Sequence, residues 1–197
     1  MRLFIAVLIS PELMHTLAKA QARLQRELNH PSLRWVAPEN FHITLLFLGE
    51  QEEERLPAIQ SVIQSVSQQV EPFDWSLHGL GVFPTWNRPS VLWAGVQEGT
   101  QPLSQLARLL AEGLSDEPSD KPFHPHITLA RIKGEGLARH RDGDFLLRLQ
   151  RTAEALGRTL RGTDHTAHLS LMLSELTPKG SRYTELERFA LRTPPTP

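Results

Sequence analysis

The chain has 197 residues, of which 40% are apolar and 22% charged, a composition typical of one globular domain or of two small lobes that share a core. It contains no cysteine, which excludes disulfide bonds, thiolate metal sites and cysteine nucleophiles and favours a reducing cytoplasm. No run of about 18 apolar residues occurs, so we expect no membrane-spanning helix and no membrane partner.

The net charge of −1 conceals an uneven distribution along the chain. Residues 1–130 hold 9 basic and 14 acidic side chains, whereas residues 131–197 hold 12 basic and 8 acidic ones. Most of the basic excess lies in residues 131–161, a segment that can steer an anionic ligand towards the protein. The alternative is a solvated, arginine-rich helix, so the composition permits an anionic ligand without requiring one.

Apolar patterning predicts strands and helices in succession. We expect strands over residues 3–9, 41–48, 73–83, 90–96, 126–132, 167–176 and 183–191. We expect helices that begin at Pro11 behind Ser10 as N-cap, after the acidic cluster 50–54, and over residues 101–114 and 145–156.

The chain also contains a loose internal repeat. The segment Phe41-His42-Ile43-Thr44-Leu45 returns 84 positions later as Pro125-His126-Ile127-Thr128-Leu129, and the turn at residues 84–88 is echoed at residues 178–182. Two copies of one unit predict a bilobal α+β fold with a pseudo-two-fold axis. We therefore expect a single domain over residues 1–192, built from two antiparallel sheets that flank a central cleft with the helices outside, and a disordered tail over residues 193–197.

The repeated segments carry the residues best suited to chemistry. In a strand, residues i and i+2 share a face, so His42 and Thr44 point one way, and His126 and Thr128 do the same in the second copy. Histidine has an ordinary pKa of about 6.5, so one ring can be protonated and the other neutral near pH 7. Such a pair suits in-line displacement at phosphorus, with the hydroxyls donating to the non-bridging oxygens. This scheme requires no metal and no other cofactor.

The sequence resembles the two-histidine (2H) phosphoesterase superfamily, and most closely the bacterial LigT-like RNA 2′,3′-cyclic phosphodiesterases, also described as 2′-5′ RNA ligases. The resemblance rests on both His-Ile-Thr-Leu motifs, on Asn40-Phe41 before the first of them, and on the segments 3–6, 47–49, 91–93, 122–131 and 180–183. It implies an enzyme that opens the terminal 2′,3′-cyclic phosphate of an RNA or nucleotide to a 2′-phosphomonoester, with 2′-5′ ligation as the reverse reaction. It also implies that His42 is the general acid and His126 the general base, an order that the residues alone leave open. We expect the enzyme to be a monomer.

Several further residues are candidates for substrate contacts: His124, Arg131, Arg88, Arg182, Tyr183, Phe41 and Trp86. His124 can share the cleft face with His126 or serve a structural role. Arg131 falls on the opposite face of a regular strand, so a functional role requires a bulge or a strand end there.

The other candidates divide by chemistry. Arg88 and Arg182 occupy equivalent hairpin turns, where they can bind flanking RNA phosphates or remain ordinary surface residues. Tyr183 can bond to the phosphate or pack at a strand start. Phe41 and Trp86 can stack an unpaired base, whereas Trp93 is expected to be buried.

Three alternatives remain at this stage. The protein can be a module that binds RNA ends or assists tRNA splicing, or a 2H enzyme that acts on another cyclic or 2′-5′ phosphodiester. A third alternative is a zinc hydrolase that uses His124, His126, His165 and His168 as ligands.

Overall fold

A computed structural model describes residues 1–115, 122–133, 143–178 and 180–193. Its strands are β1 (Arg2–Leu8), β2 (Leu33–Trp35), β3 (His42–Glu50), β4 (Phe73–Phe83), β5 (Val91–Val96), β6 (His126–Ile132), β7 (Arg161–Thr166), β8 (His168–Thr177) and β9 (Gly180–Ala190). They form one sheet in the order β7-β4-β5-β6-β3-β1-β8-β9, with β2 paired to β6, and every pairing is antiparallel. The α+β class is confirmed.

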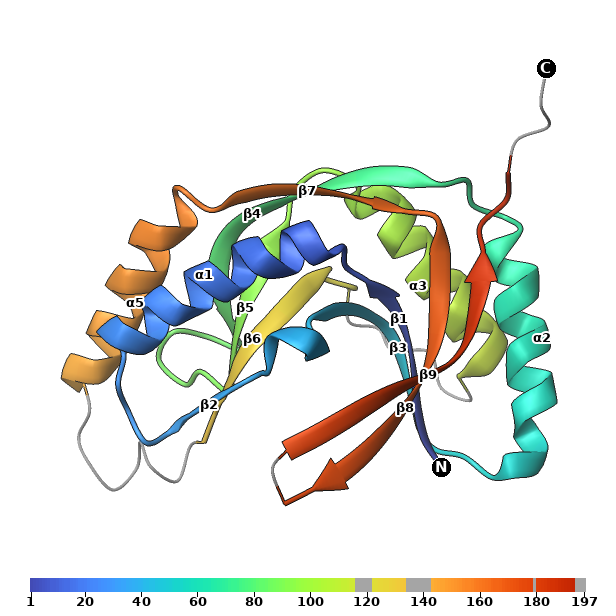
Figure 1. Cartoon of the computed structure of the whole chain (residues 1–197), viewed down its shortest axis with the longest axis horizontal. Coiled ribbons are helices and arrows are strands. Elements are labelled where there is room, and N and C mark those ends of the chain that lie inside the picture. Colours follow the sequence, from blue (N-terminus) through green and yellow to red (C-terminus); the bar gives the residue numbers. More distant parts are fainter. Residues whose placement is uncertain (116–121, 134–142, 179, 194–197) are drawn as a thin grey trace.

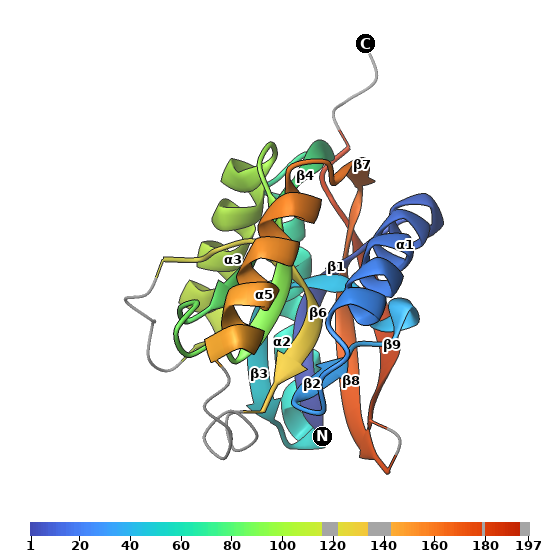
Figure 2. The same cartoon turned by 90° about the vertical axis from the view of Figure 1, so that its left-hand side faces the viewer.

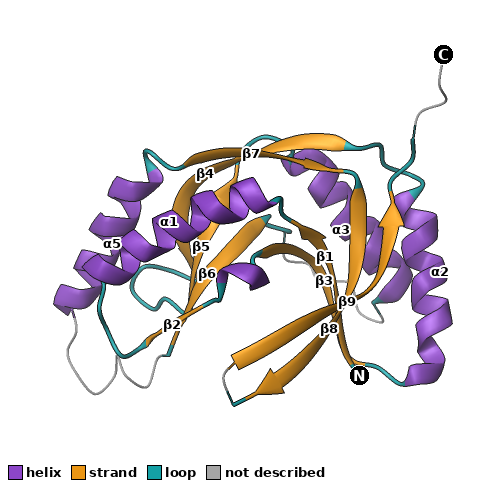
Figure 3. Cartoon of the chain, in the orientation of Figure 1, coloured by secondary structure: helices purple, strands orange, loops and turns teal. Residues whose placement is uncertain are grey.

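The helices lie outside the curved sheet (Figure 3). They are α1 (Pro11–Glu27), α2 (Leu56–Ser67), α3 (Thr100–Leu114) and α5 (Gly143–Gly157), with short 3₁₀ helices at Pro38–Asn40 and Glu53–Arg55. Helices α1 and α5 pack together near β4 and β7, whereas α2 and α3 pack together near β3, β8 and β9 (Figures 1 and 2). Among the described residues, no helix has the length and apolarity needed to cross a membrane.

The sheet consists of two arms that meet at a single pair of residues. The first arm contains β3, β1, β8 and β9, and the second contains β6, β5, β4 and β7. Ile43 of β3 pairs with Ile127 of β6, and no other pair joins these two strands. The two expected sheets are therefore joined into one. Since antiparallel strands are related by a local two-fold axis, this pair of equivalent residues marks the pseudo-two-fold axis of the repeat.

Strand β1 separates the core from the inner face of the first arm. Leu3, Ile5 and Val7 belong to the main core, and alternate residues point to the other face. There Phe4 and Ala6 form a second apolar cluster with Met172, and Tyr183 packs against this cluster.

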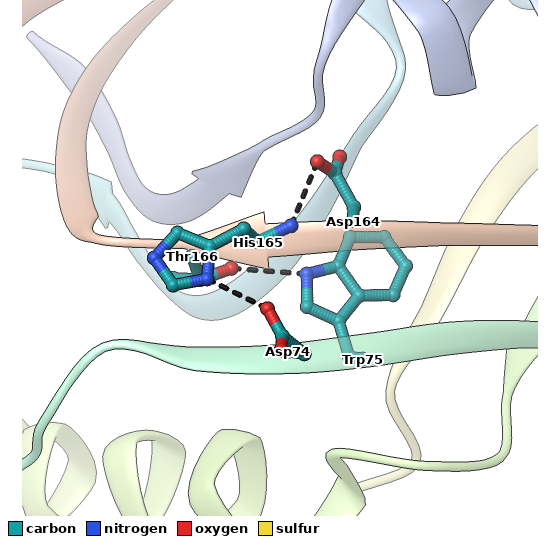
Figure 4. Close-up of polar contacts among 5 residues, drawn as sticks. All are labelled: Asp74, Trp75, Asp164, His165 and Thr166. Carbon is teal, nitrogen blue, oxygen red and sulfur yellow. Dashed lines mark hydrogen bonds and ion pairs between the residues drawn. The ribbon is translucent and has the colours of Figure 1, made fainter.

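Polar contacts fix the edge of the second arm, where β4 pairs with β7 (Figure 4). The indole nitrogen of Trp75, which is 1% exposed, donates to Thr166 Oγ1 at 3.0 Å. His165 Nδ1 lies 2.7 Å from Asp74 Oδ1, and Asp164 Oδ1 accepts from the backbone N–H of His165. The other oxygen of Asp164 accepts from the backbone N–H of Ser10, which ties the start of α1 to β7.

Ser10 caps α1, as the sequence predicts. Its hydroxyl oxygen accepts from the backbone N–H of Leu13 at 3.2 Å, and Pro11 occupies the first position of the helix. We expect Ser10→Ala to lower the free energy of unfolding by about 1 kcal/mol, because one helical N–H loses its acceptor. Urea unfolding measures this loss. Turnover is expected to stay at the wild-type level, and an unchanged unfolding midpoint would contradict the role as a cap.

Most expected elements form within a few residues of their predicted bounds. The acidic cluster 50–54 precedes α2 through a 3₁₀ turn, so α2 itself begins at Leu56. Two short strands, β2 and β7, were not predicted. Of the tail expected over residues 193–197, only Thr193 falls among the described residues, and the rest lies outside them.

Candidate active site

The structure brings the two His-x-Thr pairs into one cavity between the arms of the sheet. This cavity has a volume of about 170 Å³, and we call it the inter-arm cavity. It is lined by Val36, Asn40, His42, Thr44, Phe47, Val91, His126, Thr128, Arg131 and Tyr183. The pairs face it from β3 and β6 because Ile43 and Ile127, between them, point into the core and pair with each other.

Hydrogen bonds fix the tautomer of His42. Its Nδ1 lies 2.7 Å from the carbonyl oxygen of Asn40, and its Nε2 lies 2.9 Å from the hydroxyl of Thr44. A carbonyl only accepts, so Nδ1 carries the hydrogen and Nε2 of the neutral ring accepts from Thr44. The atom that faces the cavity is therefore the basic nitrogen.

His126 repeats this arrangement. Its Nδ1 lies 2.7 Å from the carbonyl oxygen of His124, which again makes Nδ1 the protonated nitrogen of the neutral ring. The carbonyl two residues before each histidine thus orients the ring. Nε2 of His126 has no hydrogen-bond partner in the described part of the chain, so it is free to accept from a bound molecule.

Burial favours the neutral form of both rings. It lowers the pKa of His42 to about 4, against the opposing effect of the bond to Asn40, and the charges of His126 and Arg131 lower the pKa further. Burial also lowers the pKa of His126, where the bond to the His124 carbonyl opposes it and the charges of His124 and Arg131 add to it. In the free protein both rings are therefore neutral at pH 7.

A one-residue bulge in β6 turns Arg131 into the cavity. Leu92 of β5 pairs with Ala130, but the next residue, Trp93, pairs with Thr128, so Leu129 is the extra residue. The bulge reverses the alternation of faces beyond it, and Arg131 therefore joins His126 and Thr128 in lining the cavity. A functional role of Arg131 required a bulge or a strand end at this point, and the bulge is present.

Strand β3 has the same bulge at the equivalent step. Ile5 of β1 pairs with Leu46 and Ala6 pairs with Thr44, which leaves Leu45 as the extra residue. Phe47, 84 positions before Arg131, therefore faces the same cavity and is 64% exposed. The pseudo-two-fold axis thus relates two histidines and two threonines that match, but it relates an arginine to a phenylalanine.

Aromatic rings support the two imidazoles. The ring of His42 lies 5.0 Å from that of Phe4 and 5.3 Å, edge to face, from that of Tyr183. The ring of His126 lies 4.9 Å, edge to face, from that of Phe83. Tyr183 also lines the cavity, as the sequence allowed.

Two candidates for substrate contact do not face the inter-arm cavity. Phe41 is only 4% exposed and belongs to the main core, so it cannot stack a base. Arg182 lies between Ser181 and Tyr183 on β9 and therefore points to the opposite face. There its Nε and Nη2 donate to Glu175, its partner across the β8–β9 pair.

Three other candidates lie away from the inter-arm cavity. Trp86 is half-buried and packs on the core from the β4–β5 turn, and Arg88 is exposed in the same turn. The ring of His124 lies 4.8 Å from that of Trp93, which is half-buried rather than buried, and the contact of His124 with His126 is made by its carbonyl. None of the three lines the cavity as the structure describes it.

Sequence reasoning missed Asn40 and Phe47. The amide of Asn40 donates to the carbonyl of Ser181 at 2.9 Å, which links the strand of His42 to β9. The repeat carried a signal for both residues: Asn40 stands two residues before His42, as His124 does before His126, and Phe47 matches Arg131.

The zinc alternative finds no ligand set in the described residues. No group of three or more histidine or carboxylate side chains in this part of the chain is placed to hold a metal ion. His165, one of the four histidines that this alternative requires, bonds to Asp74 at the β4–β7 edge (Figure 4).

The chain is similar in sequence to known proteins. A family model described as LigT like Phosphoesterase matches residues 7–93. The RNA 2′,3′-cyclic phosphodiesterase of Thermus thermophilus is 36% identical, over 98% of this chain and 91% of the relative. The chain belongs to the LigT-like phosphoesterase family.

Other relatives agree with this assignment. The RNA 2′,3′-cyclic phosphodiesterase of Aquifex aeolicus is 38% identical, over 80% of this chain and 81% of the relative. Among solved structures, TT0787 of Thermus thermophilus superimposes with a TM-score of 0.72 at 33% identity, and apo LigT of E. coli with 0.72 at 27% identity. Each covers 98% of both chains, so the similarity extends over the whole fold.

Proposed function

We propose that this protein hydrolyses the terminal 2′,3′-cyclic phosphate of RNA or of a nucleotide to a 2′-phosphomonoester, without a metal ion. The observation that carries the proposal is the pair of imidazoles in one cavity, each with its Nδ1 bound to a backbone carbonyl, so that Nε2 is the basic nitrogen of both rings. Two such nitrogens on opposite sides of a phosphorus atom can take a proton from one oxygen and give a proton to another.

The two imidazole rings alone can accept and donate the protons that this hydrolysis requires. His126 Nε2 takes a proton from water as the water oxygen attacks phosphorus. The bond from phosphorus to O3′ breaks, and protonated His42 gives its Nε2 proton to O3′. The assignment of His42 as acid and His126 as base follows the family resemblance. If the 5′ hydroxyl of a second RNA attacked phosphorus in place of water, the same two proton transfers would break the bond to O3′ and form a 2′-5′ linkage, which is ligation.

Protonation of His42 also prepares Thr44. In the free protein the Thr44 hydroxyl donates to Nε2 of His42. Once Nε2 is protonated it no longer accepts, and the hydroxyl can donate to a non-bridging phosphate oxygen instead. Thr128 would donate from the opposite side, and Arg131 would bind the charge that builds on these oxygens.

The relatives support a nucleotide or phosphate ligand. The relatives from Thermus thermophilus and Aquifex aeolicus are both named for the cyclic phosphodiesterase activity. E. coli LigT has been solved in complex with 3′-AMP and with phosphate.

Product analysis tests the proposal. The protein is incubated with 2′,3′-cyclic AMP and with a cyclic-phosphate-ended oligonucleotide, each with and without EDTA. We expect 2′-phosphate products, identified by phosphorus NMR against 2′- and 3′-phosphate standards, at rates that EDTA leaves unchanged. Predominant 3′-phosphate would overturn the direction of opening, and loss of activity in EDTA would overturn the metal-free scheme.

The lowered histidine pKa values predict that kcat/KM has its maximum at acidic pH. One ring must be neutral and the other protonated, so the profile is a bell whose two apparent pKa values belong to the pair. Since burial places both below 6.5 in the free protein, kcat/KM is expected to peak below pH 6.5 and to fall as the pH rises.

Bound substrate changes the pKa values of the two histidines. The anionic phosphate stabilises both imidazolium forms, so it raises their pKa values and moves the kcat profile to higher pH than the kcat/KM profile. Measuring both profiles over pH 4–9 tests the prediction. A kcat/KM that keeps rising at alkaline pH would indicate a hydroxide nucleophile instead.

A further inference from the structure

A second cavity continues from the inter-arm cavity along the inner face of the first arm. It has a volume of about 280 Å³ and shares Phe47, Arg131 and Tyr183 with the inter-arm cavity. Its other lining residues are Arg2, Leu3, Phe4, Ser174, Leu176 and Ser181. It lies beside the β8–β9 hairpin, which extends away from the helices (Figure 1), and we call it the hairpin cavity.

The apolar lining of the hairpin cavity is unusually exposed. Leu176 is 77% exposed and Phe47 64% exposed, and these are the two most exposed large apolar side chains among the described residues. Single exposed apolar residues are common, but here both border one cavity, which the buried side chain of Phe4 also lines. A flat apolar ligand would cover all of them, and a nucleobase has this character.

Two arginines border the same cavity. Arg131 lies where it meets the inter-arm cavity, and Arg2 lies on β1, four residues from the partner of Thr44. Although Glu50 is opposite Arg2 across β1 and β3, neither arginine has a carboxylate within ion-pair distance in the described part of the chain. Two unpaired guanidinium groups favour an anionic ligand.

The exposed apolar side chains and the two arginines together indicate which kind of ligand the hairpin cavity binds. A cyclic mononucleotide carries one phosphate, which the proposed function assigns to the histidines and Arg131, and it has no anion left for Arg2. An RNA that ends in a cyclic phosphate continues only on its 5′ side, through a phosphodiester and a second base. Apolar walls with a further cation match this second unit.

We propose that the hairpin cavity binds the penultimate nucleotide of the RNA, with its base between Phe47 and Leu176 and the connecting phosphodiester at Arg2. This assignment rests on the proposed function for the identity of the reacting group. It makes an RNA end, rather than a free cyclic nucleotide, the preferred substrate.

Binding of products tests this subsite without depending on turnover. The two ligands are 2′-AMP and the dinucleotide ApA that carries a 3′-terminal 2′-phosphate, which differ by one nucleotide and one phosphodiester. Their dissociation constants are measured by calorimetry at several salt concentrations. We expect the dinucleotide to bind about tenfold more tightly at low salt, from one base contact and one charged contact.

Two variants and two matched controls test which residues make the dinucleotide bind more tightly than 2′-AMP. Arg2→Gln and Leu176→Ala are each expected to weaken dinucleotide binding several-fold more than 2′-AMP binding. Arg2→Gln should also lower the slope of log K against log salt by about 0.7, the value for one phosphate contact on a single strand. The controls are Arg182→Gln, on the opposite face of the hairpin, and Leu147→Ala, exposed on α5, and both should leave the ratio unchanged.

Two results of the binding measurements would overturn the subsite, and one further result would bear on the proposed function alone. Equal binding of the two ligands to the wild type excludes a second subsite. If Arg2→Gln and Leu176→Ala weaken the binding of 2′-AMP and of the dinucleotide equally, the cavity holds the reacting nucleotide itself. A wild type that binds the dinucleotide as expected but hydrolyses no cyclic phosphate would contradict the proposed function and leave the subsite standing.

Discussion

Replacing either His42 or His126 with alanine is expected to lower kcat by about 10²–10⁴, the usual contribution of one general acid or base. Each ring lies in the inter-arm cavity with its Nδ1 held by a carbonyl, so each loss removes one of the two proton transfers. The double variant should be little slower than the slower single variant, because residues that act as a unit are not additive. Steady-state hydrolysis of a cyclic-phosphate-ended oligonucleotide measures all three.

His15→Ala is the matched control for these variants. His15 is exposed on α1, outside both cavities, and its loss should leave kcat unchanged. Circular dichroism of each variant establishes that the fold is retained. More than half of the wild-type kcat in either single variant would contradict acid–base catalysis by this pair.

Arg131→Gln is expected to lower kcat by about 10²–10³, the usual effect of removing one preorganised donor to transition-state charge. Loss of the cation should also let the pKa of both histidines rise, because the charge of Arg131 contributes to lowering each of them. The kcat/KM profile should therefore move to higher pH. A purely structural role would change the amount of folded protein and leave the profile in place.

Arg34 provides the matched control for Arg131. It lies directly opposite Arg131 across β2 and β6, is exposed, and does not line the inter-arm cavity. Arg34→Gln is expected to change kcat and the pH profile much less than Arg131→Gln. Arg131→Lys should restore the pH profile but only part of kcat, since an ammonium keeps the charge and loses the two-pronged geometry. If Arg34→Gln and Arg131→Gln changed kcat and the pH profile equally, loss of any nearby positive charge would explain the result, and no specific role of Arg131 would be needed.

The sequence predicts the elements that depend on local signals. Ser10 with Pro11 sets the start of α1, and the apolar runs set β1 and β6. The meeting of His42 with His126 was predictable as well, because a repeated motif on two strands implies a two-fold arrangement.

The residues placed wrongly or missed depend on features without a local signal. An extra residue in a strand changes which side chains share a face, and the sequence around Leu45 and Leu129 gives no sign of a bulge. The predicted position of Arg131 was therefore conditional, and Phe47 was overlooked. Phe41 precedes a strand start that the sequence does not resolve, and its burial depends on packing by distant segments.

The pairing of Ile43 with Ile127 has a mechanical consequence. These two residues are flanked by His42, Thr44, His126 and Thr128, so the one main-chain pair that joins the arms in the described part of the chain also carries the proposed acid–base groups. The positions of the two histidine backbones relative to one another are consequently set by main-chain pairing rather than by loops. The arms can diverge on either side of this pair, and the rims that touch the rest of a substrate can therefore change in shape while the reacting groups keep their separation.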